Sequence, residues 1–369
     1  MKDVLDDVER WLDNSQSVAL ATVVSTSGSS PRQPGTAMAV SSSGEVTGSI
    51  SGGCVEGAVV EEALEAIALG KPRLLTYGIA DELGLSVGLT CGGTIAVFVQ
   101  PIEQKYSGDI PIGVVFDAIR KAPQKPVALC TIVEGIQAGA KMLVSKDAPS
   151  VGSLGSTELD RVVNRDAQGL LAQRLNELCH YGGNGERRQT DVAVFIESFA
   201  PPPHLIVFGA VDFTRSLCKL GKMLGYRITV CDARSRFATP ARFPEADEVV
   251  VEWPNNYLQS IQVDHTTIIA VLTHDPKFDV PALLSAVRTP AAYIGAMGSR
   301  KATADRTRRL KESGISDTDL ARISAPIGLD IGASTPEETA VSIMAEIIAI
   351  KSGRSGGRLS QSNNPIHAG

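Results

Sequence analysis

The chain has 369 residues, of which 43% are hydrophobic and 21% are charged, and its formal net charge is −6. This composition is typical of a globular protein of about two or three domains, and the acidic balance argues against nucleic acid or an anionic membrane surface as a partner. No apolar run approaches the ~20 residues that span a bilayer, and the N-terminus has no apolar signal region, so we expect a cytoplasmic protein with reduced thiols and no membrane contact.

Hydrophobic periodicity in the first hundred residues predicts an α/β unit that begins with an amphipathic helix at residues 3–12. A β-branched run at 18–24 predicts a buried strand. The further predicted elements are strands at 37–40 and 45–50, a helix at 55–69, and strands at 73–77 and 94–100.

Residues 49–56, Ser-Ile-Ser-Gly-Gly-Cys-Val-Glu, place Cys54 between two glycines and the start of a predicted helix. Backbone N–H groups and the helix dipole at such a junction favour a thiolate, so we expect a lowered pKa for Cys54. Gly52 and Gly53 permit a close backbone approach to a ligand, and Glu56 is a further candidate contact. The alternative is a buried structural thiol; we favour the functional interpretation because the cysteine lies in a glycine loop.

A second glycine-flanked cysteine, Cys91 with Gly92, precedes the predicted strand at 94–100. We therefore predict Cys54 and Cys91 as the reactive pair of the site and Gly92 as a cofactor contact. Two low-pKa thiols suit thiol exchange, sulfur carriage or contact with a soft metal centre. The five histidines lie outside this segment and there is no Cys-x-x-Cys, so we expect no zinc site.

Residues 106–199 repeat the pattern of residues 1–105. Gly152-Ser-Leu matches Gly48-Ser-Ile, and Tyr181-Gly matches Tyr77-Gly, both at an offset of 104 residues. In this register Cys54 matches Glu158, and the second copy is shorter where the Cys91 loop would lie. Retention of the structural pattern without the cysteines indicates that the cysteines do more than support the fold.

Pro201-Pro-Pro203 marks the clearest domain boundary, so we expect an N-terminal domain at 1–199, a second domain at 200–351 and a disordered tail at 352–369. After the prolines, a strand, a turn at Gly209, a helix and a strand ending at Asp232 form a βαβ unit that resembles a dinucleotide-binding half. The turn departs from Gly-x-Gly-x-x-Gly because Val211 and Thr214 replace the second and third glycines. We expect Gly209 and Asp232 to contact a cofactor, with weak NAD(P) binding.

Further alternation, with expected strands at 249–253, 266–272 and 291–294 and expected helices at 281–287 and 301–310, predicts a Rossmann-like parallel sheet, at whose carboxyl edge ligands collect. Thr273-His-Asp275 and Gly295-Ala-Met-Gly-Ser-Arg300 fall at this edge. The alternatives are a helix cap for His274 and Asp275 and a solvated charge for Arg300. The candidate cofactor contacts at this edge are His274, Asp275, Gly298, Ser299 and Arg300.

The chain resembles the xanthine dehydrogenase accessory protein family of XdhC/CoxI type. The resemblance rests on Gly48 to Glu56, Cys91-Gly-Gly-Thr94, the βαβ unit, the two edge segments, and Ile327-Gly-Leu-Asp-Ile-Gly332 with Thr335-Pro-Glu-Glu338. It implies a maturation factor that binds molybdenum cofactor, assists its sulfuration with a cysteine desulfurase, and inserts it into an apo molybdenum hydroxylase of xanthine or carbon monoxide dehydrogenase type.

Two hypotheses therefore remain. The first is a cofactor-binding maturation chaperone rather than a turnover enzyme. The second is an NAD(P)-dependent oxidoreductase that uses the Rossmann-like crevice, with His274 as an acid–base group. The altered Gly209 turn and the cysteine loops favour the first, and a homo-oligomer is compatible with either.

Overall fold

The computed structural model describes residues 1–28, 32–78, 93–102, 110–186 and 189–362. Two compact units divide the chain, Met1–Pro201 and Pro202–Ser362. In the part of the chain so described, no helix has both the length and the apolar character needed to cross a membrane.

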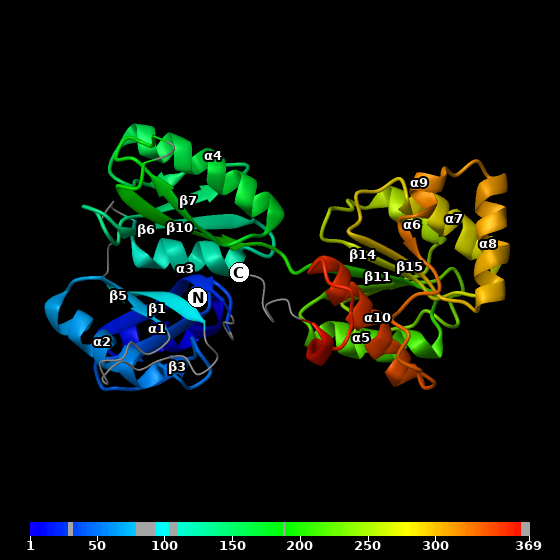
Figure 1. Ribbon diagram of the computed structural model, residues 1–369, viewed down its shortest axis with the longest axis horizontal. Coiled ribbons are helices and arrows are strands. Elements are labelled where there is room, and N and C mark those ends of the chain that lie inside the picture. The colour runs from blue at the N-terminus through cyan, green and yellow to red at the C-terminus, as the bar shows by residue number, and fades with distance from the viewer. Residues whose placement is uncertain (29–31, 79–92, 103–109, 187–188, 363–369) are drawn as a thin grey trace. The chain divides into compact units, whose positions relative to one another are not determined.

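The N-terminal unit contains two antiparallel five-stranded sheets with the same strand order (Figure 1). The orders are β3-β2-β1-β5-β4 and β8-β7-β6-β10-β9. This correspondence confirms the internal repeat that the sequence predicted. The elements of the first copy are η1 (Lys2–Val4), α1 (Leu5–Asp13), β1 (Val18–Ser27), β2 (Ala37–Ser41), β3 (Val46–Gly48), α2 (Glu56–Leu69), β4 (Arg73–Tyr77) and β5 (Thr94–Ile102). Those of the second are α3 (Ile112–Lys121), β6 (Val127–Glu134), β7 (Lys141–Ser145), β8 (Val151–Gly152), α4 (Thr157–Gln173), β9 (Glu177–Tyr181) and β10 (Val192–Phe199).

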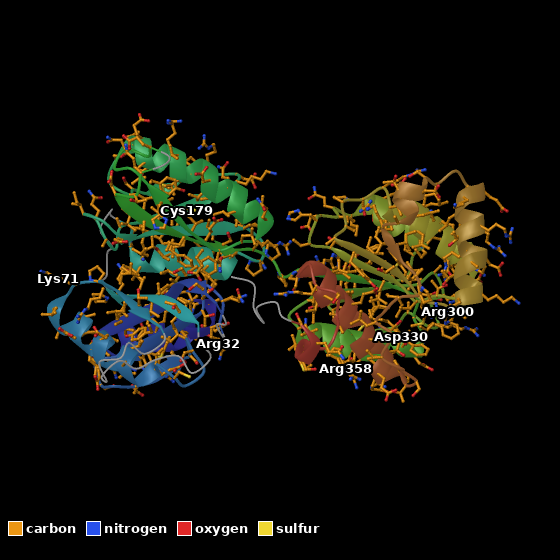
Figure 2. The ribbon with its side chains drawn as sticks, in the orientation of Figure 1. Arg32, Lys71, Cys179, Arg300, Asp330 and Arg358 are labelled. Carbon is orange, nitrogen blue, oxygen red and sulfur yellow. The ribbon has the colours of Figure 1, made fainter. Side chains whose placement is uncertain are left out.

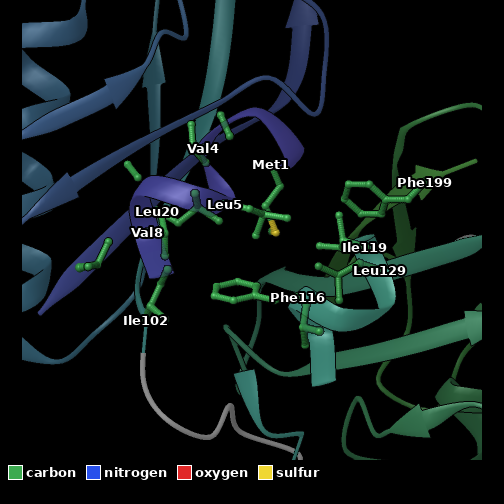
Figure 3. Packing of buried hydrophobic residues seen from close by; sticks show 14 of the residues in the cluster. Met1, Val4, Leu5, Val8, Leu20, Ile102, Phe116, Ile119, Leu129 and Phe199 are labelled. Carbon is green, nitrogen blue, oxygen red and sulfur yellow. The ribbon is translucent and has the colours of Figure 1, made fainter. Parts of the chain in front are cut away.

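The two faces of strand β1 pack against different layers because successive side chains in a strand point to opposite sides. Ala19, Ala21 and Val23 pack against helix α2. Leu20 lies on the opposite face, in a core that includes Phe116 and Leu129 of the second repeat (Figure 3). The repeats therefore share a core, and each sheet is covered by its own long helix, α2 or α4, on its other face.

A small polar cluster interrupts the apolar interface between the sheets. Lys141 is 3% exposed, and its Nζ donates to Gln100 Oε1 at 2.7 Å and to Thr131 Oγ1 at 3.0 Å. Glu197 is also buried and accepts from the Met1 amino group at 3.3 Å. Burial lowers the pKa of Lys141 to about 7, although nearby Glu197 opposes the shift.

The C-terminal unit is a parallel six-stranded sheet in the order β13-β12-β11-β14-β15-β16, with helices on both faces (Figure 1). This is the doubly wound order in which the strand order reverses between the first and fourth strands, here β11 and β14, and it confirms the predicted Rossmann-like sheet. Its strands are β11 (His204–Phe208), β12 (Arg227–Cys231), β13 (Glu248–Val250), β14 (Ile268–Val271), β15 (Tyr293–Ala296) and β16 (Ile323–Ser324). Its helices are α5 (Asp212–Met223), α6 (Pro254–Ser260), α7 (Pro276–Ala286), α8 (Arg300–Glu312), α9 (Asp317–Leu320), α10 (Pro336–Lys351) and η2 (Leu359–Gln361).

Helix α7 differs most from the predicted elements. The sequence predicted a helix starting at Pro281, but α7 begins at Pro276, with Asp275 as its N-cap, and Pro281 lies inside it. Proline is well tolerated at the first helical position, so Pro276 rather than Pro281 marks the start. Part of the expected disordered tail, residues 352–362, is described and includes η2; the rest lies outside the described residues.

Candidate functional site: the Cys54 loop and the Rossmann edge

The loop before α2 is wrapped around the carboxylate of Glu56, the first residue of that helix. Each carboxylate oxygen accepts from one serine hydroxyl and two backbone N–H groups. The donors to Oε1 are Ser49 Oγ at 2.8 Å, Ser51 N at 2.9 Å and Gly52 N at 2.9 Å. The donors to Oε2 are Ser51 Oγ, Gly53 N at 2.8 Å and Val55 N at 3.2 Å. The side chain of Glu56 therefore fills the backbone cradle that the sequence suggested for an external ligand.

The electrostatics of the loop follow from these contacts. Burial by itself would raise the pKa of Glu56, but the hydrogen bonds from Ser51 and Ser49 outweigh it and hold the pKa well below its ordinary value. The carboxylate also lies at the N-terminus of α2, where the helix dipole favours negative charge. Glu56 is thus a charged clip that fixes the loop.

Cys54 lies in this loop with its thiol half-buried against the core between α2 and the first sheet. Its N–H donates to Ser51 Oγ at 3.0 Å. Gly52 and Gly53 are exposed and have φ values of +88° and +120°, which side-chain-bearing residues rarely adopt. The two glycines thus permit the turn that places the cysteine at the surface end of the helix.

The second repeat has a carboxylate, that of Asp160, which accepts hydrogen bonds from the segment before its helix, but it lacks the Gly-Gly-Cys loop. Ser153 Oγ donates to Asp160 Oδ2 at 2.8 Å, and Leu154 N donates to Asp160 Oδ1 at 2.7 Å. Asp160 matches Glu56 at the offset of 104 residues. At the same offset α2 and α4 end at matching residues, but α4 begins three residues earlier, at Thr157. In the first repeat the three matching residues, Gly53–Val55, lie outside the helix, and the longer glutamate side chain reaches around them.

Of the predicted reactive pair, Cys91 and its neighbour Gly92 lie outside the described residues. The remaining cysteines have environments unlike that of Cys54. Cys130, Cys218 and Cys231 are buried, and burial raises the pKa of each thiol, to about 12 for Cys218 and Cys231. Cys179, on strand β9 (labelled in Figure 2), is half-buried, and burial also raises its pKa.

In the Rossmann unit, Gly209 and Asp232 lie where the sequence predicted, at the ends of β11 and β12. Gly209 has a φ of +113°, and a Cβ there would lie 2.8 Å from the backbone nitrogen of Thr273, so the two strand ends meet closely. Asp232 is 4% exposed; its carboxylate accepts from Ala210 N at 2.8 Å and from Arg234 Nη2 at 2.7 Å. The acid that would bind a ribose hydroxyl is therefore already paired within the chain.

The turn after β11 also differs electrostatically from a typical dinucleotide site. Helix α5 begins at Asp212, whose side chain is 91% exposed. An acidic group in the first helical turn opposes the pyrophosphate that usually binds there. The turn itself offers no feature that favours a dinucleotide over other ligands.

The second predicted group lies at the ends of β14 and β15. Asp275 caps α7 by accepting from Lys277 N at 3.1 Å, which is the alternative role that the sequence left open. Ser299 caps α8 by accepting from Ala302 N at 3.2 Å. His274 is exposed, and so is Arg300, the first residue of α8 (labelled in Figure 2). Gly298 packs closely against α8, because a Cβ there would lie 3.3 Å from Ala302 Cβ.

Beneath these residues lies a buried ion pair that sequence reasoning missed. Arg306 is 7% exposed, and its Nη2 donates to Asp279 Oδ2 at 3.0 Å and to Met297 O at 2.6 Å. Burial raises the pKa of Asp279, against hydrogen bonds from Thr273 and Arg306. Arg306 Nη1 is buried and has no hydrogen-bond partner in the described structure. A buried donor left in this state costs about 1–3 kcal/mol.

Two family models match the chain. A model of the XdhC and CoxI family matches residues 11–78 and 121–182, and one of the XdhC Rossmann domain matches residues 205–347. The chain belongs to the XdhC and CoxI family. The first match covers the Cys54 loop in one repeat and the corresponding segment in the other, and the second covers the Rossmann sheet.

Curated relatives of this XdhC and CoxI family member include proteins with and without a described role. A Bacillus subtilis protein described as a probable subunit of xanthine dehydrogenase is 28% identical over 92% of this chain and 95% of its own length. The molybdenum cofactor insertion chaperone PaoD of Escherichia coli is 24% identical over 92% of this chain and 85% of its own length. The uncharacterized protein YqeB of Escherichia coli is 28% identical over 65% of this chain, but the match spans only 46% of that protein.

A crystal structure of a xanthine dehydrogenase from Bacillus halodurans has the same fold, with a TM-score of 0.69 and 24% identity over 98% of each chain. Among the described residues of this family member, no group of three or more histidine, cysteine or acidic side chains is arranged to hold a metal ion. The half-buried thiol of Cys54 is therefore the soft ligand that the described part of the Cys54 loop offers.

Proposed function

We propose that the protein is a maturation factor that binds molybdenum cofactor and delivers it to an apo molybdenum hydroxylase of xanthine or carbon monoxide dehydrogenase type. The names of PaoD and of the Bacillus subtilis relative support this role. The observation that carries the proposal for this chain is the Cys54 loop. Helix α2 starts three residues later than the corresponding helix α4 of the second repeat, and these three residues belong to the loop.

The chemistry of the loop suits a soft ligand better than a hard anion. The N–H groups of Gly52 and Gly53 are directed to Glu56, whose negative charge repels an approaching oxyanion. A thiolate at Cys54 would instead bind molybdenum or sulfur, both of which favour soft partners. Gly52, Gly53 and Glu56 then act by holding the cysteine in place, and Cys91 with Gly92 remains a proposed second contact.

The same thiol suits sulfur transfer from a cysteine desulfurase. A persulfide on the desulfurase would pass its outer sulfur to the Cys54 thiolate. The donor S–S bond breaks as a new one forms on Cys54, and the desulfurase leaves as a thiolate, so no external oxidant is needed. The residues of the Rossmann edge that remain proposed cofactor contacts are Gly209, Asp232, His274, Asp275, Gly298, Ser299 and Arg300.

The test compares Cys54→Ala with Cys179→Ala, since both thiols are half-buried and only the first lies in the loop. Each full-length variant is purified from a molybdenum-replete host, and its pterin and molybdenum contents and its activation of an apo molybdenum hydroxylase are measured. We expect Cys54→Ala to lose cofactor or activation while keeping its melting temperature, and Cys179→Ala to keep all three. Full cofactor content and full activation in Cys54→Ala would show that the cysteine is structural.

A further inference from the structure

A pocket of about 160 Å³ lies at the carboxyl edge of the Rossmann sheet, between the start of α7 and the first three turns of α8. His274 and Pro276 line it from the α7 side. Ala302, Arg306 and Arg309 line it from one face of α8, because residues four and seven apart project from the same side of a helix. Arg306 is 7% exposed whereas the other α8 residues of the lining are exposed, so its guanidinium lies at the bottom of the pocket.

Arg306 has one donor group that the fold does not use. Its Nη2 is anchored to Asp279 and to Met297 O, which fixes the plane of the guanidinium. With the plane fixed, Nη1 cannot turn toward either acceptor, and it has no partner among the residues that the structure describes. A ligand in the pocket can supply an acceptor for Nη1 after a small local shift, which is needed because the atom is buried.

The charge around the pocket favours an anion. The buried carboxylate of Asp279 is neutralised by Arg306, and Asp305 at the rim lies 4.0 Å from Arg308. Arg309 and the positive end of α8 remain, since Ala302 is in the first turn of that helix, whereas the carboxylate of Asp275 caps α7. The volume is below the ~300–1,000 Å³ of sites that enclose a whole ligand, so a single charged group fits best.

We propose that this pocket binds a phosphate group, either as free phosphate or as the phosphate end of a larger molecule. Arg306 and Arg309 are its cationic contacts, and the N-terminus of α8 supplies surrounding positive potential. A guanidinium held in a fixed plane suits the oxygens of phosphate. His274 of the lining is also a proposed cofactor contact, but this proposal rests on the geometry around Arg306 and not on the maturation function.

The test places a carboxylate in the pocket without touching Arg306. Ala302 is the third residue of α8, and a negative charge is favourable in the first turn of a helix, so Ala302→Glu should leave the helix stable. Ala302→Gln has the same size without the charge and is the matched control. Binding of inorganic phosphate and of phenyl phosphate to the full chain is measured by calorimetry at constant ionic strength, alongside the melting temperature.

We expect Ala302→Glu to weaken phosphate binding about tenfold or more, since like charges a few ångströms apart repel strongly in a partly buried site. Ala302→Gln should bind as the wild type does. Arg309→Ala should weaken binding several-fold, whereas Lys311→Ala, which removes an exposed charge of α8 outside the pocket lining, should not. Tighter binding of phenyl phosphate than of phosphate supports the phosphate end of a larger molecule, and the reverse supports the free ion.

Two results would overturn the proposal. One is the absence of saturable binding of either probe to the wild-type protein. The other is equal binding by Ala302→Glu and Ala302→Gln in proteins of equal melting temperature, which would place any bound phosphate elsewhere. Cofactor delivery is measured separately, through Cys54 and the client enzyme, so failure of this proposal and failure of the maturation function can be distinguished.

Discussion

Replacing Glu56 by glutamine keeps the shape of the side chain and removes its charge, so it tests whether the carboxylate holds the Cys54 loop. The amide nitrogen must take the place of one carboxylate oxygen. If it replaces Oε1, the N–H groups of Ser51 and Gly52 lose their acceptor; if it replaces Oε2, those of Gly53 and Val55 do. Either way, two backbone donors face another donor.

The second orientation costs less. Val55 N–H also reaches Ser51 Oγ at 3.1 Å, and Gly53 is exposed, so water can accept from its N–H. The hydrogen bonds that remain are no longer made to a charged acceptor. Their weakening costs about 1–2 kcal/mol of stability, because solvent reaches part of the loop. Loss of a negative charge at the first residue of α2 adds about 0.3–1 kcal/mol. We expect Glu56→Gln to lower the free energy of unfolding of the N-terminal unit by about 1–3 kcal/mol.

Urea unfolding of the two proteins at several pH values measures this difference. Because the folded state lowers the pKa of Glu56 below its ordinary value of 4.5, the carboxylate contributes fully above that pH, and its contribution is lost as the pH falls toward the folded-state pKa. The gap between wild type and Glu56→Gln should therefore narrow below pH 4.5. Asp160→Asn is the matched control and should cost less, because one oxygen can keep Leu154 N–H while the Ser153 hydroxyl rotates to accept.

A different outcome would refute the reasoning. If Glu56→Gln were as stable as the wild type at pH 7, or if the gap did not change with pH, the loop would not depend on the charge. An equal loss in Asp160→Asn would show that the extra donors around Glu56 add nothing.

Three further predictions follow from burial and backbone geometry. Iodoacetamide at pH 8 should modify Cys54 before Cys218, because burial raises the pKa of the Cys218 thiol to about 12; modification in the reverse order, followed by peptide mass spectrometry, would contradict this. The unfolding free energy of the wild type relative to Lys141→Met should rise by about 1–3 kcal/mol from pH 7 to pH 9, because the unfolded chain holds a lysine proton that the folded chain, with a pKa of about 7, has released. A pH-independent difference would show that Lys141 stays charged. Gly209→Ala should destabilise the Rossmann unit by about 2–3 kcal/mol in thermal or urea unfolding, because backbone strain and a close contact combine at this residue. The control Gly225→Ala has a φ of +81° but open space for a Cβ, so it should cost about 1 kcal/mol.

The layers of the fold could be predicted because they depend on local periodicity. Alternating residues such as Ala19 and Leu20 belong to different cores, and the repeat in the sequence corresponds to two sheets with the same strand order. The start of α7 could not be placed as well, since Pro276 and Pro281 are both reasonable first residues by sequence alone. The cap formed by Asp275 decides between them.

The site was harder to predict than the fold because its side chains act over distances that a sequence does not show. Glu56 was a candidate contact for a cofactor, but its side chain instead accepts hydrogen bonds from the loop that precedes it. Arg306 is one of several basic residues on α8, and its burial depends on α7 packing alongside and on the position of Asp279. The spacing of Ala302, Arg306 and Arg309 was the signal that could have indicated a shared face.

The Glu56 clip also determines which molecules can compete for the Cys54 loop. A ligand tethered by its own chain is present at an effective concentration in the millimolar range or above, so a dissolved anion of modest affinity cannot displace it. Cellular phosphate and carboxylates should therefore leave the loop amides undisturbed. The sulfur atom of Cys54 is then accessible to a partner, while the backbone N–H groups around it do not bind the most abundant small anions. The loop therefore selects its ligands by chemical type rather than by size.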